Sequence, residues 1–178
     1  MPTCILLPGH TSKSQGALAP DGTSEWEFNR LLAPLIHNFV RRTQILPFYR
    51  HHYADLPQEL NQFPASFIIE LHCNAFNREA SGSEVLYCDK SPLSARYAAF
   101  LQREFVTALD LPNRGIKATR TEDRGGRLLC KTTAPCLIAE PFFIDNPDDF
   151  HRATSRRFSL ANAYARAIDL ISQEISHA

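Results

Sequence analysis

The sequence predicts one α/β domain, in which a twisted, mostly parallel sheet of about six strands carries helices on both faces. The first reason is that short β-rich runs alternate along the chain with longer segments of helical periodicity. The second is that several of the short runs are continuously apolar, as expected for strands buried on both faces of a parallel sheet. With 178 residues, the chain is long enough to bury a core of ordinary size.

Strands are expected where apolar and β-branched residues gather between turn-forming residues. The expected strands are residues 3–7, 44–49, 66–72, 84–88 and 136–143, with a weaker candidate at 116–119. In open α/β sheets, functional side chains gather at the carboxyl ends of the strands. His10, His72 and Glu140 lie at or near the ends of such runs, so a site is expected at that edge of the sheet.

Three helices are expected between and after these strands. The first begins at Ser24, where the motif SEWE is typical of a capping box and is followed by apolar residues at helical spacing. The second opens at Pro92, since proline is favoured at the first helical position. The third opens at Pro147 and is expected to run without a break to about residue 175.

The composition excludes some classes of partner. Nineteen basic and nineteen acidic residues give a formal charge of zero, which offers no whole-chain attraction to nucleic acid or to an anionic membrane. The first ten residues lack the basic segment of a Sec-type signal peptide. No apolar run is long enough to cross a bilayer. We therefore expect synthesis in the cytoplasm and no stable membrane insertion, and the oligomeric state stays open.

Five cysteines are present, an odd number that cannot all pair within one chain. No C-x-x-C motif occurs, which argues against a zinc ribbon or finger. Three of the five lie inside apolar runs, where a free cysteine behaves as a small hydrophobic residue. We therefore expect reduced thiols in the core.

Most polar residues near the strand ends are ambiguous when each is taken alone. His10 follows a tight turn, and a lone histidine in a loop is usually a surface residue. Glu25 lies on the first turn of a helix, where the helix dipole by itself favours a carboxylate. His72 closes a buried run and must bind either a backbone carbonyl or a metal. His51 and His52 are a possible competing metal pair, but adjacent side chains of a strand point to opposite faces, so we expect polar loop residues.

Glu140 has an argument of its own, because apolar segments surround it on both sides. A glutamate is rarely buried in such a place without a partner. Burial would raise its pKa and a nearby metal would lower it again, which suits a general base and acid. Two histidines and one carboxylate, His10, His72 and Glu25, could bind Zn²⁺ and leave a fourth position open for water beside it.

Five segments together resemble the zinc-dependent N-acetylmuramoyl-L-alanine amidases of the amidase-3 type, in that family's order and spacing. The segments are PGHTSKSQGA, GTSEWEFN, ELHCNAF, NRGIK and APCLIAEPFFIDNPDD. The resemblance implies that His10, Glu25 and His72 hold one zinc ion and that Glu140 is the catalytic acid and base. It also implies hydrolysis of the amide between N-acetylmuramic acid and L-alanine in peptidoglycan.

Two further residues are candidates for substrate binding. Asn74 follows His72 by two positions and could orient a ligand or the substrate, and Arg114 lies in a segment similar to the family's Arg-Gly-x-Lys. Two features depart from the family. Residues 11–14 lack the glycines that are common after the family's leading histidine, so the path of this loop around the metal could differ. Glu70 stands where the family usually has serine, which adds a carboxylate beside the metal strand and could alter the hydrogen bonds around the metal.

No linker or repeat divides the chain, so residues 1–178 are expected to form one catalytic domain without a separate wall-binding domain. Such a domain fits a phage or prophage lysis enzyme that is released through a membrane lesion and acts on the cell wall. One alternative is a zinc carboxypeptidase or another amidohydrolase on a related fold, using the same four residues on a different amide. Another is a catalytically silent wall-binding module, which would have no need of Glu140.

Overall fold

The six expected strands form one sheet in the order β2-β1-β3-β6-β4-β5. We describe residues 1–177 of a computed structural model of the chain. The strands are β1 (Thr3–Pro8), β2 (Gln44–Pro47), β3 (Phe67–Leu71), β4 (Ser83–Cys88), β5 (Asn113–Thr119) and β6 (Cys136–Glu140). The weak candidate at residues 116–119 is thus part of a full edge strand.

All neighbouring strands run parallel except β4 and β6, which are antiparallel. This confirms the prediction of a mostly parallel sheet. The single reversal has a consequence for function, because the first residues of β4 and β5 lie at the same edge as the last residues of β1, β3 and β6. Side chains from both kinds of strand end can therefore meet.

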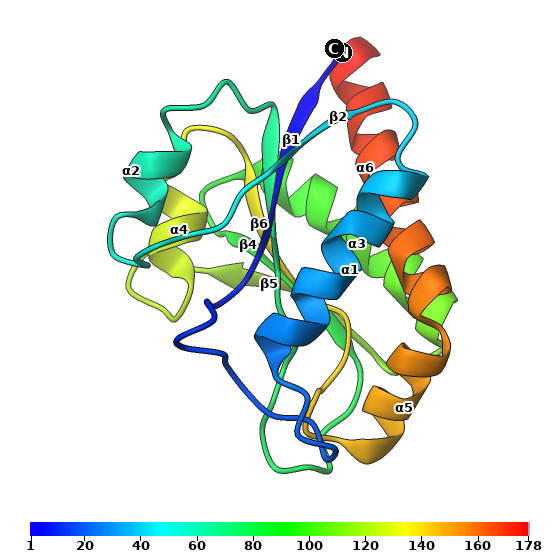
Figure 1. The fold of residues 1–178 in the computed structure, drawn as a ribbon. Helices are drawn as coiled ribbons and strands as arrows, with labels where there is room; N and C mark the ends of the chain where they lie inside the picture. The colour runs from blue at the N-terminus through cyan, green and yellow to red at the C-terminus, as the bar shows by residue number, and fades with distance from the viewer. Residues whose placement is uncertain (178) are drawn as a thin grey trace.

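Helices cover both faces of the sheet (Figure 1), as predicted. They are α1 (Glu25–Phe39), α2 (Leu56–Leu60), α3 (Pro92–Leu109), α4 (Gly126–Lys131), α5 (Pro147–Ser155) and α6 (Arg157–His177). Successive residues of β1 alternate between the two faces: Cys4 and Leu6 pack with α1, α3 and α6, whereas Ile5 and Leu7 pack with α2 and α4.

The helix predictions hold at the starts and fail at two other points. The capping box at Ser24 forms in full, with the Glu27 side chain bonded back to the cap. The last helix is two helices that meet at Arg156, where the predicted helix was unbroken. No glycine or proline lies at this break. We therefore attribute it to the packing of α5 and α6 against the other helices and not to the local sequence. Helices α2 and α4 were not predicted, because five or six residues are too few to show a helical period.

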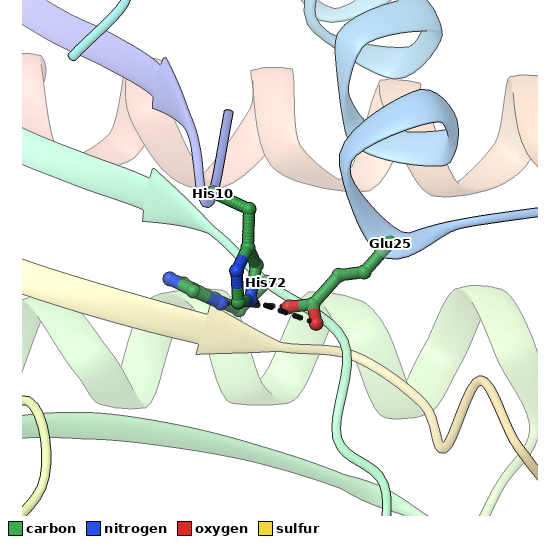
Figure 2. Close-up of side chains that lie close together, drawn as sticks. All are labelled: His10, Glu25 and His72. Atoms are coloured by element: carbon green, nitrogen blue, oxygen red, sulfur yellow. Dashed lines mark hydrogen bonds and ion pairs between the residues drawn. The ribbon is translucent and has the colours of Figure 1, made fainter. Parts of the chain in front are cut away.

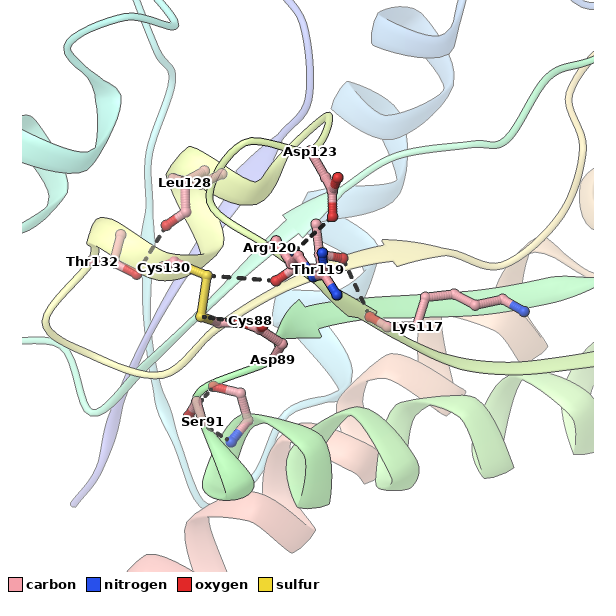
Figure 3. The surroundings of a disulfide bond; sticks show 11 residues. Cys88, Asp89, Ser91, Lys117, Thr119, Arg120, Asp123, Leu128, Cys130 and Thr132 are labelled. Atoms are coloured by element: carbon pink, nitrogen blue, oxygen red, sulfur yellow. Dashed lines mark hydrogen bonds between the residues drawn. A yellow bond between two sulfur atoms is a disulfide. The ribbon is translucent and has the colours of Figure 1, made fainter.

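The prediction that all cysteines are reduced is wrong for two of them. Cys88, at the end of β4, forms a disulfide with Cys130 of α4 (Figure 3). The two residues lie 42 positions apart, so only the fold brings them together. Cys4, Cys73 and Cys136 are buried free thiols, as expected. No helix within residues 1–177 has both the length and the hydropathy needed to cross a membrane.

Candidate active site

His10 projects from a sharp turn directly after β1. Its φ angle is 67°, a left-handed conformation that residues other than glycine rarely adopt. The preceding Gly9 donates its N–H to the carbonyl of Leu71 at 2.7 Å, which holds the turn against the end of β3. A Cβ atom on Gly9 would lie 2.4 Å from the ring of His72, so only glycine lets this ring pack over the turn.

Glu25 is the first residue of α1, and the backbone fixes its carboxylate. Oε1 accepts a hydrogen bond from the N–H of Cys73 at 2.9 Å, and Oε2 accepts one from the N–H of Ala17 at 3.3 Å. Gly16, with a φ angle of 79°, passes so close that a Cβ there would lie 2.5 Å from Oε2. The carboxylate is therefore held from both sides while α1 begins.

His72 completes a compact group with these two residues, as Figure 2 shows. It follows β3 directly and donates its backbone N–H to Ala139 of β6 at 2.9 Å. Its Nδ1 lies 2.7 Å from Oε1 of Glu25, and Nε2 of His10 lies 3.0 Å from Oε2 of the same carboxylate. One nitrogen or oxygen from each of the three side chains lies within 4.8 Å of the others.

Charge interactions within this group oppose the effect of burial. Burial alone would raise the pKa of Glu25, but the adjacent imidazoles of His10 and His72 hold it well below its ordinary value. Burial likewise disfavours a charged His72. The negative charge of Glu70 and the hydrogen bonds to Glu25 and Glu70 overcome this and raise the pKa of His72 to about 10. The carboxylates of Glu25 and Glu70 therefore favour a positive charge at this position.

The donor atoms fit a zinc ion. Two imidazole nitrogens and a carboxylate are the ligand types of catalytic zinc sites. The Nε2 atom of His10 is buried and makes no hydrogen bond of acceptable geometry within the described residues, so this nitrogen is available to a metal. The group opens onto a cavity of about 470 Å³ that His10 and His72 help to line, which leaves access for a water molecule and a substrate.

A family model described as N-acetylmuramoyl-L-alanine amidase, Amidase_3, matches residues 4–170. The chain belongs to this family. It is therefore an amidase that hydrolyses the bond between N-acetylmuramic acid and L-alanine in peptidoglycan. The predicted reaction class is confirmed, and the alternatives of a carboxypeptidase or a silent binding module are set aside.

Solved amidases share the fold. The N-acetylmuramoyl-L-alanine amidase of Clostridium difficile 630 superposes with a TM-score of 0.84 at 19% identity, over 99% of this chain and 98% of that chain. The CwlD amidase of Clostridioides difficile, solved with the GerS lipoprotein, gives 0.85 at 20% identity, over 98% and 100%. The catalytic domain of an endolysin targeting Clostridia Difficile gives 0.81 at 22% identity, over 94% and 97%. No curated protein matches the chain significantly.

Glu140 of the amidase ends β6 and lines the same cavity as the two histidines. Strands β3 and β6 pair in register up to Leu71 and Ala139, so His72 and Glu140 are the next residues on neighbouring strands. Burial raises the pKa of Glu140 to about 7; the charge of His72 acts against this, and those of Glu84 and Glu25 add to it. A carboxyl group of this pKa can both accept and return a proton near neutral pH.

The two predicted substrate-binding residues meet at a carboxylate that sequence reasoning missed. Glu84, at the start of β4, is buried and lies opposite Glu140 in the antiparallel pair. Its Oε1 accepts a bond from Nδ2 of Asn74 at 2.7 Å, and its Oε2 accepts one from Nε of Arg114 at 2.8 Å. Asn74 lines the cavity, whereas Arg114 lies over the ring of Phe143 with its side chain 39% exposed. The sequence feature that could have identified Glu84 is an acidic residue at the start of an otherwise apolar strand.

Other residues that line the cavity lie in segments for which the sequence predicts neither a helix nor a strand. They are Arg50 and Tyr53 after β2, and Asp123, Arg124, Gly125 and Arg127 around the start of α4. His51 and His52 are exposed in the loop after β2, as expected, and do not belong to the possible metal-binding groups of residues 1–177.

Proposed function

We propose that the amidase holds one zinc ion between His10, Glu25 and His72, and that Glu140 is the general base and acid of the hydrolysis. The observation that carries this proposal is the convergence of three zinc-type ligands beside a cavity that Glu140 also lines. When bound, zinc supplies a Lewis acid that polarises the scissile carbonyl and makes a water molecule more acidic.

The residues of the chain handle the proton. Glu140 takes a proton from the attacking water and gives it to the nitrogen of the leaving L-alanine, for which a pKa near neutrality is suited. The side chain of Asn74 lines the cavity and is held in place by its hydrogen bond to the Glu84 carboxylate. We assign Arg114 to substrate contact at the outer side of Glu84, where its side chain is partly exposed.

Two variants test the proposal together. Glu140→Gln is expected to keep zinc and lose at least about 10²-fold in kcat, because a neutral amide cannot accept the proton. His72→Ala is expected to lose zinc, because only two of the three ligands remain. The measurements are zinc content of the purified proteins and release of free stem peptides from peptidoglycan.

A wild-type protein that holds no zinc, or a Glu140→Gln variant of unchanged kcat, would contradict the proposal. Release of terminal amino acids in place of whole stem peptides would contradict the choice of amide.

We also propose that the enzyme works at the cell wall or in the periplasm, in a phage-type lysis role, after synthesis in the cytoplasm. The Cys88–Cys130 disulfide supports an oxidising compartment, since structural disulfides are rare in cytosolic proteins. The similarity to the catalytic domain of an endolysin motivates the lysis role. Purified protein added from outside is expected to lyse cells with an accessible wall, and a protein that cleaves isolated peptidoglycan but never lyses such cells would contradict this role.

A further inference from the structure

A second carboxylate lies on the far side of His72 from Glu25. Glu70 precedes His72 by two residues at the end of β3, so both side chains leave the same face of the sheet. Its Oε2 lies 3.1 Å from Nε2 of His72. The imidazole therefore has one carboxylate at each nitrogen, Glu25 at Nδ1 and Glu70 at Nε2.

Glu70 is fully buried, with 0% exposure. A buried carboxylate without a partner would destabilise the domain, so its contacts account for its presence. Besides its ion pair with His72, it accepts a hydrogen bond at Oε1 from Nη1 of Arg50 at 2.7 Å. Arg50 itself is nearly buried, with a side chain 9% exposed, and stacks over the ring of Tyr53 at 4.9 Å.

This chain of contacts crosses the sheet. Arg50 follows β2, the edge strand, and reaches past β1 to a carboxylate on β3. An arginine held by a stacked ring and a short bond to a carboxylate has little freedom to move. Glu70 is therefore fixed in position as well as paired.

The position of Glu70 decides which nitrogen of His72 faces the proposed metal. A neutral imidazole has one N–H and one lone pair. Glu25 and Glu70 can both only accept, so the ring must present an N–H to each of them unless a metal takes one lone pair. With zinc held beside Glu25 and His10, Nδ1 would supply that lone pair and the one N–H would stay on Nε2, facing Glu70. Histidine ligands of metals are commonly oriented by a carboxylate in this way.

We propose that Glu70, held by Arg50, is the positioning residue for His72: it fixes the ring orientation and the tautomer that offer Nδ1 to zinc. The inference rests on the proposed zinc site. Arg50 and Glu70 then serve metal binding although neither is a ligand.

The test is the zinc affinity of Glu70→Gln, measured by competition with a chromogenic chelator. The expected result is a 10- to 100-fold weaker affinity than wild type, the usual cost of losing such a partner. Glu104→Gln is the matched control, because Glu104 is a carboxylate 5% exposed that pairs with Arg103 and Arg166 on α3 and α6, away from the cavity. It is expected to lower the melting temperature without changing the affinity for zinc.

A second variant keeps the test decisive if Glu70→Gln folds poorly, because that change leaves Arg50 without its anion. The double variant Arg50→Met with Glu70→Gln removes the buried charges as a unit, and it is expected to fold and to show the same loss of zinc affinity. If either folded variant binds zinc as tightly as wild type, the positioning role is wrong and the proposed zinc site stands. If wild type binds no zinc, both proposals fall.

Discussion

At the scale of single residues, two acidic side chains face each other beside the proposed zinc site. Glu84 and Glu140 are partners in the antiparallel pair of β4 and β6. Burial is the main cause that raises the pKa of Glu140 to about 7, and the like charge of Glu84 adds to it. Glu84 is itself held by Asn74 and Arg114. Burial and the charge of Glu84 therefore act together on the pH at which Glu140 loses its proton.

We expect Glu84→Gln to move the acidic limb of the kcat/KM profile to lower pH. Removing the negative charge lowers the pKa of Glu140, so the basic form that accepts a proton is present at lower pH. Bound zinc lowers this pKa in wild type and variant alike, which leaves the direction of the difference unchanged. The measurement is the pH dependence of stem-peptide release.

Glu84→Asp serves as the control for this prediction, because it keeps the charge and its limb should stay near that of wild type. A Glu84→Gln profile with the wild-type limb would show that Glu84 does not control the protonation of Glu140.

The residues of the site differed in how far sequence alone could identify them. Glu140 is conspicuous, since a carboxylate interrupts an apolar run. His10 and Glu25 have ordinary local explanations and were selected only by the order of motifs in a family. The role of Arg50 could not be predicted, because it follows β2 and its partner Glu70 lies on β3, a strand that does not pair with β2.

At the scale of elements, the short helix α4 forms one wall of the cavity. Arg124, Gly125 and Arg127 line the cavity from the start of this helix. The Cys88–Cys130 disulfide ties the helix to the end of β4 (Figure 3). The start of α4 packs closely against the preceding loop, because a Cβ on Gly126 would collide with the carbonyl oxygen of Arg120. The wall is thus held at both ends of the helix.

We expect the double variant Cys88→Ser with Cys130→Ser to lose stability and to bind substrate less tightly. For a loop closed across 42 residues, the disulfide contributes roughly 4 kcal/mol of stability by constraining the unfolded chain. That corresponds to a fall in melting temperature of about 10 °C for a domain of this size. KM should rise, because the wall that α4 provides is no longer tied to β4.

Thermal melting and stem-peptide kinetics measure these effects, with reduced wild type as the control that should behave like the variant. Thiol titration of unfolded wild type should find three free cysteines before reduction and five afterwards. Five thiols before reduction would contradict the disulfide.

The elements that could be predicted are those with a local signal of sufficient length. Helix α1 has a capping box and fifteen residues of amphipathic pattern, and β1 and β3 are runs of buried apolar residues. The break between α5 and α6 at Arg156 has no such signal. Tertiary packing decides it, since α6 must lie against α1 and α3 while α5 is held at its start by the cap of Asn146.

At the scale of the whole molecule, the proposed metal group joins three parts of the chain. Its members follow β1, begin α1 and follow β3, at positions 10, 25 and 72. A ligand that binds only when these segments are together stabilises the folded state by mass action. Zinc is therefore expected to act on the stability of the entire domain.

We expect removal of zinc by a chelator to lower the melting temperature, and its return to restore it. At zinc concentrations about 1,000 times Kd the stabilisation is roughly 4 kcal/mol, or on the order of 10 °C. Scanning calorimetry measures the change, and His72→Ala should show none. An equal response of wild type and His72→Ala would mean that zinc acts elsewhere.

By itself the sequence determined the kind, order and approximate extent of the main elements, and the resemblance of its motifs to a family pointed to the candidate zinc ligands. This was possible because apolar periodicity, caps and turn residues act over a few neighbouring positions. Only the tertiary structure decided the reversal of β4, which places Glu84 opposite Glu140, the bond between Cys88 and Cys130, and the contact of Glu70 with His72. Strand direction and long-range contacts depend on which surfaces are buried together, and no local pattern records that.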